Sequence, residues 1–238
     1  MTLIVRNLQL VRDRITTACV AAGRQPDSVR LMAVSKKFGA DAVLQAVSDG
    51  QRVFGENYIA EGVEKITALH SMLPADTTLE WHCIGPVQSN KTRLVAEHFD
   101  WVQSVDRLKI AERLSEQRPA ELPPLQICIQ VNIDGGATKS GVAPDDAQAL
   151  AQAVSKLPRL QLRGLMAIPE PAPDFVAACA LYTLARALFD QINSAGVLPG
   201  AMDTLSIGMT ADLEAAIHAG STMVRVGTAI FGNRTGRD

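Results

Sequence analysis

Two stretches near the end of the chain repeat one local pattern: Thr204-Leu205-Ser206-Ile207-Gly208-Met209-Thr210 and Thr222-Met223-Val224-Arg225-Val226-Gly227-Thr228. Each begins with an apolar run that predicts a buried β-strand and continues into a turn that contains glycine and threonine. A helical segment follows each turn. A strand that leads through a short turn into a helix is the repeating unit of parallel α/β folds, so these stretches predict that fold class.

The same strand-to-helix order extends back to residue 30, after an opening helix whose apolar residues form one stripe. Several of the strand runs are apolar without strict alternation, which is typical of parallel strands that helices cover. Between them, we expect Asp106 to cap a helix over 106–117, and Pro144 and Pro173 to begin two further helices. The predicted strands are Arg30–Ser35, Arg52–Glu56, Leu79–Ile84, Trp101–Val105, Leu125–Ile133, Gln161–Ile168, Thr204–Ile207 and Thr222–Val226.

About eight such units in a chain of 238 residues predict one (β/α)8 barrel of the TIM type, with the opening helix as an addition. The alternative is a doubly wound sheet. Such a sheet usually has a glycine-rich fingerprint after its first strand, and Ser35-Lys36-Lys37-Phe38-Gly39 lacks it. Because no linker or change of composition divides the chain, we expect a single domain over residues 1–238.

Composition narrows the class of protein further. With 47% hydrophobic residues, 20% charged residues and a formal net charge of −2, the chain is neither disordered nor basic enough to attract nucleic acid. We expect neither a signal peptide nor an apolar run of the ~18 residues that a membrane span requires. The four histidines and four cysteines show no metal-ligand spacing, and such cysteines indicate reduced thiols. We therefore expect a cytoplasmic protein that binds no metal, membrane or nucleic acid.

In a barrel of this type the reactive residues lie where strands end, because all the strand-to-helix loops meet on one face. Lys36 and Lys37 follow the first predicted strand. A lysine that is partly buried there has a lowered pKa, and its neutral amine can form an imine with an aldehyde. Strand alternation directs only one of the two lysines inward, and the residue pattern leaves open which one. A solvated loop lysine is the ordinary alternative.

The turns after the seventh and eighth strands have the composition of an anion site, with Gly208 and Thr210 in one and Gly227 and Thr228 in the other. Glycine and hydroxyl residues at helix starts present N–H and O–H groups to a phosphate, although they also serve as ordinary turn residues. These loops are the usual phosphate site of such barrels. Arg225, just before the second turn, needs a ligand ring or an anion as a partner if it is buried. A lysine, a phosphate loop and an inward arginine together describe a pyridoxal phosphate pocket.

Seven motifs carry a resemblance to a known family. They are Ala33-Val34-Ser35-Lys36, Phe54-Gly55-Glu56-Asn57-Tyr58, Trp81-His82-Cys83-Ile84-Gly85-Pro86-Val87-Gln88-Ser89-Asn90-Lys91, Lys139-Ser140-Gly141, Arg163-Gly164-Leu165-Met166, Ser206-Ile207-Gly208-Met209-Thr210 and Met223-Val224-Arg225-Val226-Gly227-Thr228-Ala229-Ile230-Phe231-Gly232. In this order they span nearly the whole chain. The chain resembles the pyridoxal phosphate homeostasis protein family, a single barrel similar to the N-terminal domain of alanine racemase.

The resemblance assigns roles that the residue pattern left open. Lys36 matches the lysine that forms the internal aldimine with pyridoxal 5'-phosphate, and Arg225 matches the residue that faces the pyridine nitrogen. We expect His82 to be structural rather than a catalytic base. Thr210 stands where the family is expected to have serine, and the hydroxyl is kept. The other expected cofactor-binding residues are Asn57 and Met166, which line the pocket, and Ser206, Gly208, Gly227 and Thr228, in the phosphate loops.

The resemblance implies a protein that holds pyridoxal phosphate and buffers it or delivers it to apo-enzymes, with no catalytic residue. A guanidinium opposite the pyridine nitrogen disfavours protonation of that nitrogen and weakens the ring as an electron sink. In the racemase, a second domain supplies an opposing tyrosine; here the chain ends at Asp238, and we expect a monomer without that domain. The alternatives are an amino-acid racemase with Tyr58 as the second base, and a Schiff-base aldolase that acts on sugar phosphates.

Overall fold

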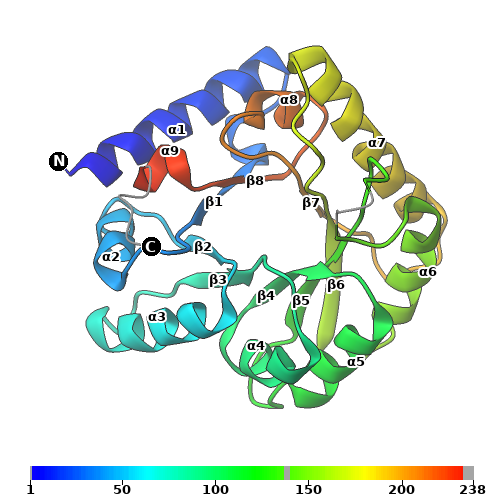
Figure 1. Cartoon of the computed structure of the whole chain (residues 1–238), viewed down its shortest axis with the longest axis horizontal. Coiled ribbons are helices and arrows are strands. Elements are labelled where there is room, and N and C mark those ends of the chain that lie inside the picture. Colours follow the sequence, from blue (N-terminus) through cyan, green and yellow to red (C-terminus); the bar gives the residue numbers. More distant parts are fainter. Residues whose placement is uncertain (1, 137–139, 233–238) are drawn as a thin grey trace.

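The fold was obtained as a computed structural model, which describes residues 2–136 and 140–232. Eight parallel strands form a closed barrel in which each strand pairs with the next and β8 pairs back with β1. Helices surround the barrel as a ring (Figure 1). The predicted (β/α)8 barrel is therefore confirmed. The strands are β1 (Arg30–Val34), β2 (Val53–Glu56), β3 (Glu80–Cys83), β4 (Trp101–Val105), β5 (Leu125–Gln130), β6 (Leu160–Met166), β7 (Thr204–Ser206) and β8 (Met223–Val226).

Each predicted strand is present, with ends that differ by a few residues. The largest difference is at β5, which stops at Gln130; beyond it, Val131 forms only an isolated bridge with Val142. The helices are α1 (Leu3–Ala21), α2 (Ala40–Ser48), α3 (Ile59–Met72), α4 (Thr92–His98), α5 (Leu108–Gln117), α6 (Pro144–Val154), α7 (Phe175–Ser194), α8 (Leu213–His218) and α9 (Thr228–Phe231), with 3-10 turns η1 (Pro26–Ser28) and η2 (Ser89–Lys91).

One predicted helix cap is wrong. Asp106 does not cap α5, which begins at Leu108 after Arg107, and no side-chain hydrogen bond caps it. The Asp106 carboxylate instead accepts a hydrogen bond from the guanidinium of the neighbouring Arg107. A local ion pair therefore takes the carboxylate that an N-cap needs.

The additional helix α1 packs beside α8 and α9 at one side of the barrel (Figure 1). Its buried stripe includes Leu8, Val11 and Ile15. The polar face also contributes, because Arg14 forms a salt bridge with Glu214 of α8 at 2.8 Å and donates to the carbonyl oxygen of Thr210 at 3.0 Å. The helix thus holds the loop between β7 and α8.

Helix α7 is the most apolar long helix in the described part of the chain. It begins at Phe175, two residues after the predicted Pro173, and Asp174 caps it by accepting a hydrogen bond from the N–H of Ala177. It is long and apolar enough to cross a membrane, contrary to the expectation from the sequence, and it is the one described helix that meets this test. A core helix passes the same test; here 28% of the apolar stretch is buried, and Tyr182, Phe189 and Ile192 are among the buried residues.

Side chains fill the interior of the barrel. One cluster contains Met32, Val34, Ile84 and Met223, and a second contains Trp101, Cys128 and Met166. Fully or almost fully buried polar groups lie among them, namely His82, Gln103, Ser206 and Arg225. A ligand therefore has room at the end of this barrel rather than along its axis.

Candidate functional site

The residues predicted to bind the cofactor gather at the carboxyl end of five consecutive strands, β6, β7, β8, β1 and β2. Ala33 of β1 lies opposite Val226 of β8, so the loops that follow these two strands are neighbours. The rings of Phe38 and Phe231 confirm the proximity, with centroids 5.2 Å apart. Lys36 and the turn at Thr228 therefore share one side of the barrel mouth.

The structure distinguishes Lys36 from Lys37, which the residue pattern could not do. Lys36 is partly buried, whereas Lys37 is exposed and has a left-handed backbone with φ of 65°. The Lys37 ammonium lies 5.8 Å from the centroid of the Tyr58 ring. The chain thus turns outward at Lys37, and Lys36 is the lysine left nearer the barrel.

A buried ion pair holds the residue that precedes Lys36. The Glu56 carboxylate, at the end of β2, accepts hydrogen bonds from the Lys65 ammonium at 2.5 Å and from the Ser35 hydroxyl at 2.6 Å. Lys65 also donates to the carbonyl oxygen of Ser35 at 2.8 Å. The side chains of Lys65 and Glu56 are 4% and 0% exposed, so water does not compete for these bonds. The backbone just before Lys36 is therefore fixed.

The residue after Lys36 is held as well. Glu61 accepts a hydrogen bond from the backbone N–H of Lys37 and one from Lys65 at 3.2 Å. Sequence reasoning missed Glu61 and Lys65 and gave no role to Glu56, which lies in one of the quoted motifs. The available signal was the spacing of Glu61 and Lys65, four residues apart on a helix, with Lys65 on the face that carries buried Ile59 and Leu69.

Arg225 lies inside the barrel on β8 with only 4% of its surface exposed. Its Nη1 donates to the carbonyl oxygen of Ser206 at 2.6 Å and to the Ser206 hydroxyl at 2.8 Å, and its Nη2 donates to the carbonyl oxygen of Ala167 at 2.9 Å. Burial lowers the pKa of this guanidinium, but arginine remains protonated in proteins. The end of the barrel therefore holds a cation bonded to neutral acceptors.

Ser206 has a different place from the one expected of a phosphate-loop residue. It has no exposed surface, and its hydroxyl donates to the Gln103 side chain at 2.7 Å while accepting the bond from Arg225. Its contact with the cofactor stays a prediction, because a side chain without exposed surface reaches a ligand only if its neighbours move. Its contact with Arg225 is therefore the direct role that the geometry gives it.

Asp212, the residue before α8, holds the loop between β7 and α8 together with Tyr182 of α7 and Arg14 of α1. Asp212 accepts one hydrogen bond from the backbone N–H of Met209 at 2.6 Å and another from the hydroxyl of Tyr182 at 2.9 Å. Arg14 holds the carbonyl oxygen of Thr210 from the other side. The position of Thr210 is thus set before any ligand arrives.

Gly208 is the residue that allows this loop its path. Its φ is +94°, and a Cβ at this position would lie 2.5 Å from the Cβ of Ala216. We expect Gly208→Ala to cost at least ~1–2 kcal/mol of unfolding free energy, because an L residue is strained there and the loop must shift. Thermal and urea unfolding measure this cost. Gly200→Ala is the matched control, since nothing lies within 4 Å of its added Cβ; equal stability of the two variants contradicts the assignment.

The two threonines of the predicted phosphate loops come together. The hydroxyl of Thr228 lies 3.4 Å from that of Thr210. Gly227 precedes Thr228 at the start of α9, and a Cβ on Gly227 would lie 3.1 Å from the carbonyl oxygen of Val34. This glycine lets the end of β8 approach β1 closely, so both hydroxyls and the first N–H groups of α9 lie beside the loop of Lys36.

Asn57 and Met166 lie at the same end of the barrel as the other predicted residues. Asn57 follows β2 and is partly buried, and its carbonyl oxygen would lie 2.1 Å from a Cβ added to Gly85. Met166 ends β6 opposite Ser206 and is 1% exposed, packed with Trp101 and Cys128. Of the motifs quoted above, Lys139 lies outside the described residues.

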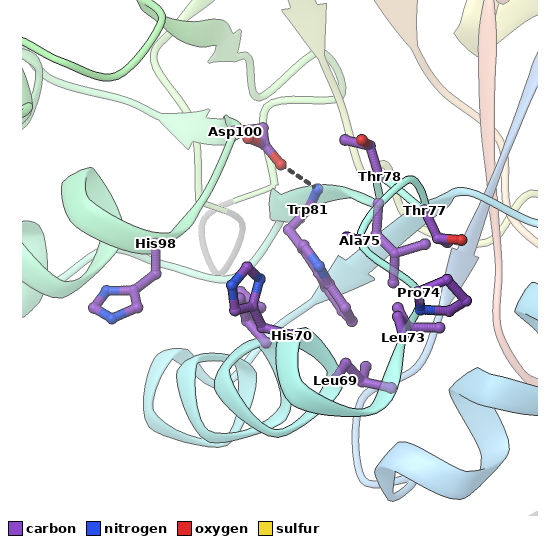
Figure 2. Close-up of a pocket in the computed structure, with 12 residues that line it drawn as sticks. Leu69, His70, Leu73, Pro74, Ala75, Thr77, Thr78, Trp81, His98 and Asp100 are labelled. Carbon is purple, nitrogen blue, oxygen red and sulfur yellow. Dashed lines mark hydrogen bonds between the residues drawn. The ribbon is translucent and has the colours of Figure 1, made fainter.

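A separate cavity of about 310 Å³ lies at the other end of β3, below Trp81 (Figure 2). His70 and His98 come from the ends of α3 and α4, and Asp100 accepts a hydrogen bond from the N–H of Trp81 at 2.8 Å. Residues 2–136 and 140–232 contain no group of three His, Cys, Asp or Glu residues that could hold a metal ion. None of the predicted cofactor-binding residues lines this cavity.

The sequence relatives decide the family. Residues 7–235 match the profile of the alanine racemase N-terminal domain. The chain is 55% identical to the pyridoxal phosphate homeostasis protein of Pseudomonas aeruginosa, with 98% of this chain and 97% of that one covered. The chain belongs to the pyridoxal phosphate homeostasis protein family. Another member, from Escherichia coli, is 52% identical over 97% of each chain.

Solved structures extend the comparison with this family. PipY of Synechococcus elongatus, determined with PLP bound, is 35% identical, with a TM-score of 0.82 over 96% of this chain and 100% of that chain. Alanine racemase of Clostridium difficile has a TM-score of 0.70 at 16% identity, and the match covers 98% of this chain but 58% of the racemase. The likeness to the racemase concerns the fold alone.

The residues present fit pyridoxal phosphate. The partly buried Lys36 suits the aldehyde, and the buried cation Arg225 suits the aromatic ring. The adjacent hydroxyls of Thr210 and Thr228 suit the phosphate, and all four residues lie at neighbouring strand ends. Thr228, at the start of α9, is exposed, so this strand end is open to an approaching phosphate.

Proposed function

We propose that this protein binds pyridoxal 5'-phosphate in the cytoplasm and buffers it or delivers it to apo-enzymes, as a monomeric single-domain barrel without robust catalysis. Arg225 is the observation that carries the proposal. It is a buried cation, bonded to neutral acceptors, at the end of β8 and beside the loops of Lys36 and Thr228. The names of the relatives and the PLP-bound PipY structure support the same cofactor.

Each part of the site has a distinct task in this proposal. Pyridoxal phosphate supplies an aldehyde that reacts reversibly with a primary amine. Lys36 provides that amine, held in place by the fixed backbone on either side of it. Thr210, Thr228 and the start of α9 bind the phosphate. Arg225 faces the pyridine nitrogen and opposes its protonation, while Asn57 and Met166 line the ring.

The tyrosines argue against racemisation. The Tyr182 hydroxyl donates to Asp212, and burial, together with Asp212, raises the pKa of Tyr182 well above its ordinary value. Tyr58 is 49% exposed, with its ring beside the Lys37 ammonium. These are the two tyrosines of the chain. The bond of Tyr182 to Asp212 and the exposed position of Tyr58 beside Lys37 support the proposal of a protein that does not racemise amino acids.

Hydrogen exchange at the α-carbon of amino acids tests the absence of catalysis. We expect loaded protein, incubated with alanine or serine in D2O, to exchange that hydrogen no faster than free pyridoxal phosphate at the same concentration. The reason is that the Arg225 guanidinium opposes protonation of the pyridine nitrogen and so weakens the ring as the electron sink that removal of the α-proton requires. NMR or mass spectrometry follows the exchange. Exchange that is faster, and lost in Lys36→Ala, supports a racemase instead.

A transfer experiment tests delivery. Loaded protein is mixed with an apo-enzyme that requires pyridoxal phosphate, with and without a trap for the free aldehyde. Reactivation that persists in the presence of the trap supports direct delivery. Reactivation that the trap abolishes shows that the protein only releases free pyridoxal phosphate and acts as a buffer.

A further inference from the structure

A continuous hydrogen-bond chain runs through the barrel interior, away from the site. It begins at Arg225, whose Nη1 donates to the Ser206 hydroxyl at 2.8 Å, and continues from Ser206 to the side-chain oxygen of Gln103 at 2.7 Å. The Gln103 amide nitrogen lies 3.0 Å from Nδ1 of His82, and Nε2 of His82 lies 2.7 Å from the Glu80 carboxylate. The chain therefore joins β8, β7, β4 and β3, from the carboxyl end of the barrel to the amino end.

The negative charge of Glu80, at the far end, determines which group donates and which accepts in every hydrogen bond of this chain. Burial opposes ionisation of Glu80, but the hydrogen bonds from His82 and Arg30 and the charge of Arg30 outweigh it and lower the pKa of Glu80. Glu80 is then an acceptor only, so Nε2 of His82 must donate. Burial lowers the pKa of His82, and Glu80 and Arg30 are the charged groups that face it. A neutral His82 with its proton on Nε2 has Nδ1 as an acceptor.

The remaining orientations follow from that tautomer. Gln103 must present its NH2 group to Nδ1 of His82, and its oxygen is then the acceptor for the Ser206 hydroxyl. The Ser206 oxygen is thereby oriented to accept from Arg225. From Arg225 to Glu80, each group donates to the next, so a cation begins the series and an anion ends it. Such alignment strengthens each bond in a low-dielectric interior.

The surroundings of this chain exclude water. His82, Gln103 and Ser206 have no exposed surface. The His82 ring stacks on Trp101 with centroids 4.9 Å apart, and the second amide hydrogen of Gln103 points to the sulfur of Met223 at 3.1 Å. Every polar atom of Gln103 is thus engaged, and the amide cannot turn over without losing bonds.

We propose that Gln103 and His82 are positioning residues that orient the Arg225 guanidinium for the bound cofactor, through Ser206, by a hydrogen-bond chain whose donors all point toward Glu80. The proposal rests on the proposed function only in its last step, where Arg225 meets the cofactor. It assigns His82 a purpose that the sequence left as merely structural. Neither Gln103 nor His82 touches the cofactor in this account.

The tautomer of His82 tests the hydrogen-bond chain in wild-type protein without cofactor. We expect 15N NMR of the imidazole ring to show a neutral His82 with its proton on Nε2 at pH 7 and above. A proton on Nδ1, or a charged ring at pH 7, overturns the proposal. This measurement requires neither a variant nor cofactor binding, so its failure is separate from failure of the proposed function.

The effect on Arg225 is tested with Gln103→Leu, which cuts the chain in its middle. We expect dissociation of pyridoxal phosphate to be about tenfold faster, and the pH titration of the bound-cofactor absorption band to shift, because a misplaced guanidinium stabilises the ring less well. The matched control is Gln126→Leu, on β5 outside the chain, where both readouts should stay as in wild type. If Gln103→Leu folds and leaves both readouts unchanged, the positioning role is wrong.

Discussion

Lys36→Ala is expected to remove the visible absorption of the bound cofactor and to lower the affinity for pyridoxal phosphate by at least about 100-fold, because only the phosphate and ring contacts remain. The fold should be intact, because Lys65 and Glu61 hold the backbone of Ser35 and Lys37, and Glu56 holds the Ser35 hydroxyl. Absorption spectroscopy and equilibrium dialysis measure both effects.

Lys37→Ala is the control for that variant. Lys37 is exposed and turned outward beside Tyr58. Its removal should change the affinity by no more than about twofold, as for an ordinary surface charge. If Lys37→Ala loses the cofactor and Lys36→Ala keeps it, the two lysines have been assigned the wrong way round.

Lys65→Met is expected to destabilise the folded protein by about 3–5 kcal/mol, because it leaves the Glu56 carboxylate buried without its cation. The second oxygen of Glu56 already has no hydrogen-bond partner in the described structure, so nothing else is placed to replace Lys65. Urea unfolding measures the loss. Because the same pair holds the backbone before Lys36, cofactor retention should fall as well.

The loss in Lys65→Met should depend on pH in a defined direction. Burial raises the pKa of Glu56, whereas Lys65 lowers it, so removal of Lys65 raises it further. The folded variant then binds a proton more tightly than the unfolded chain does. Its stability therefore falls as the pH rises from the ordinary value of a glutamate through the raised folded value, and recovers as the pH is lowered.

Two controls accompany Lys65→Met. The double variant Lys65→Met with Glu56→Gln should recover most of the stability, because the buried charge is gone. Lys109→Met removes an exposed lysine from α5 and should have little effect. If the free energy of unfolding of Lys65→Met is within about 1 kcal/mol of the wild-type value at neutral pH, the Lys65–Glu56 pair does not stabilise the fold as described.

The sequence was sufficient to predict the barrel, because its strands are apolar runs bounded by glycine, proline and polar turns. The strand-to-helix unit is also repeated along the chain. Strand ends were less certain, as at β5, where a single bridge at Val131 replaces a continued ladder. Asp106 shows a second limit. Aspartate often caps helices, but here the neighbouring Arg107 binds the Asp106 carboxylate instead.

The strand-end rule also located the predicted site residues, because parallel strands bring their carboxyl ends to one face. It could not choose between Lys36 and Lys37, since alternation stops where the chain turns at Lys37. It also placed Ser206 with the phosphate loops, whereas the serine is buried under Arg225. That placement depends on Gln103, which is far away in the sequence and has no motif of its own.

Borohydride reduction of the loaded protein, followed by proteolysis and mass spectrometry, is the most direct test that Lys36 holds the cofactor. Reduction makes the covalent link permanent, so the labelled peptide identifies the amine. We predict one label, on Lys36, and no label at that site in Lys36→Ala. A label on Lys37 or another lysine, or bound cofactor that borohydride does not trap, contradicts this account of the site.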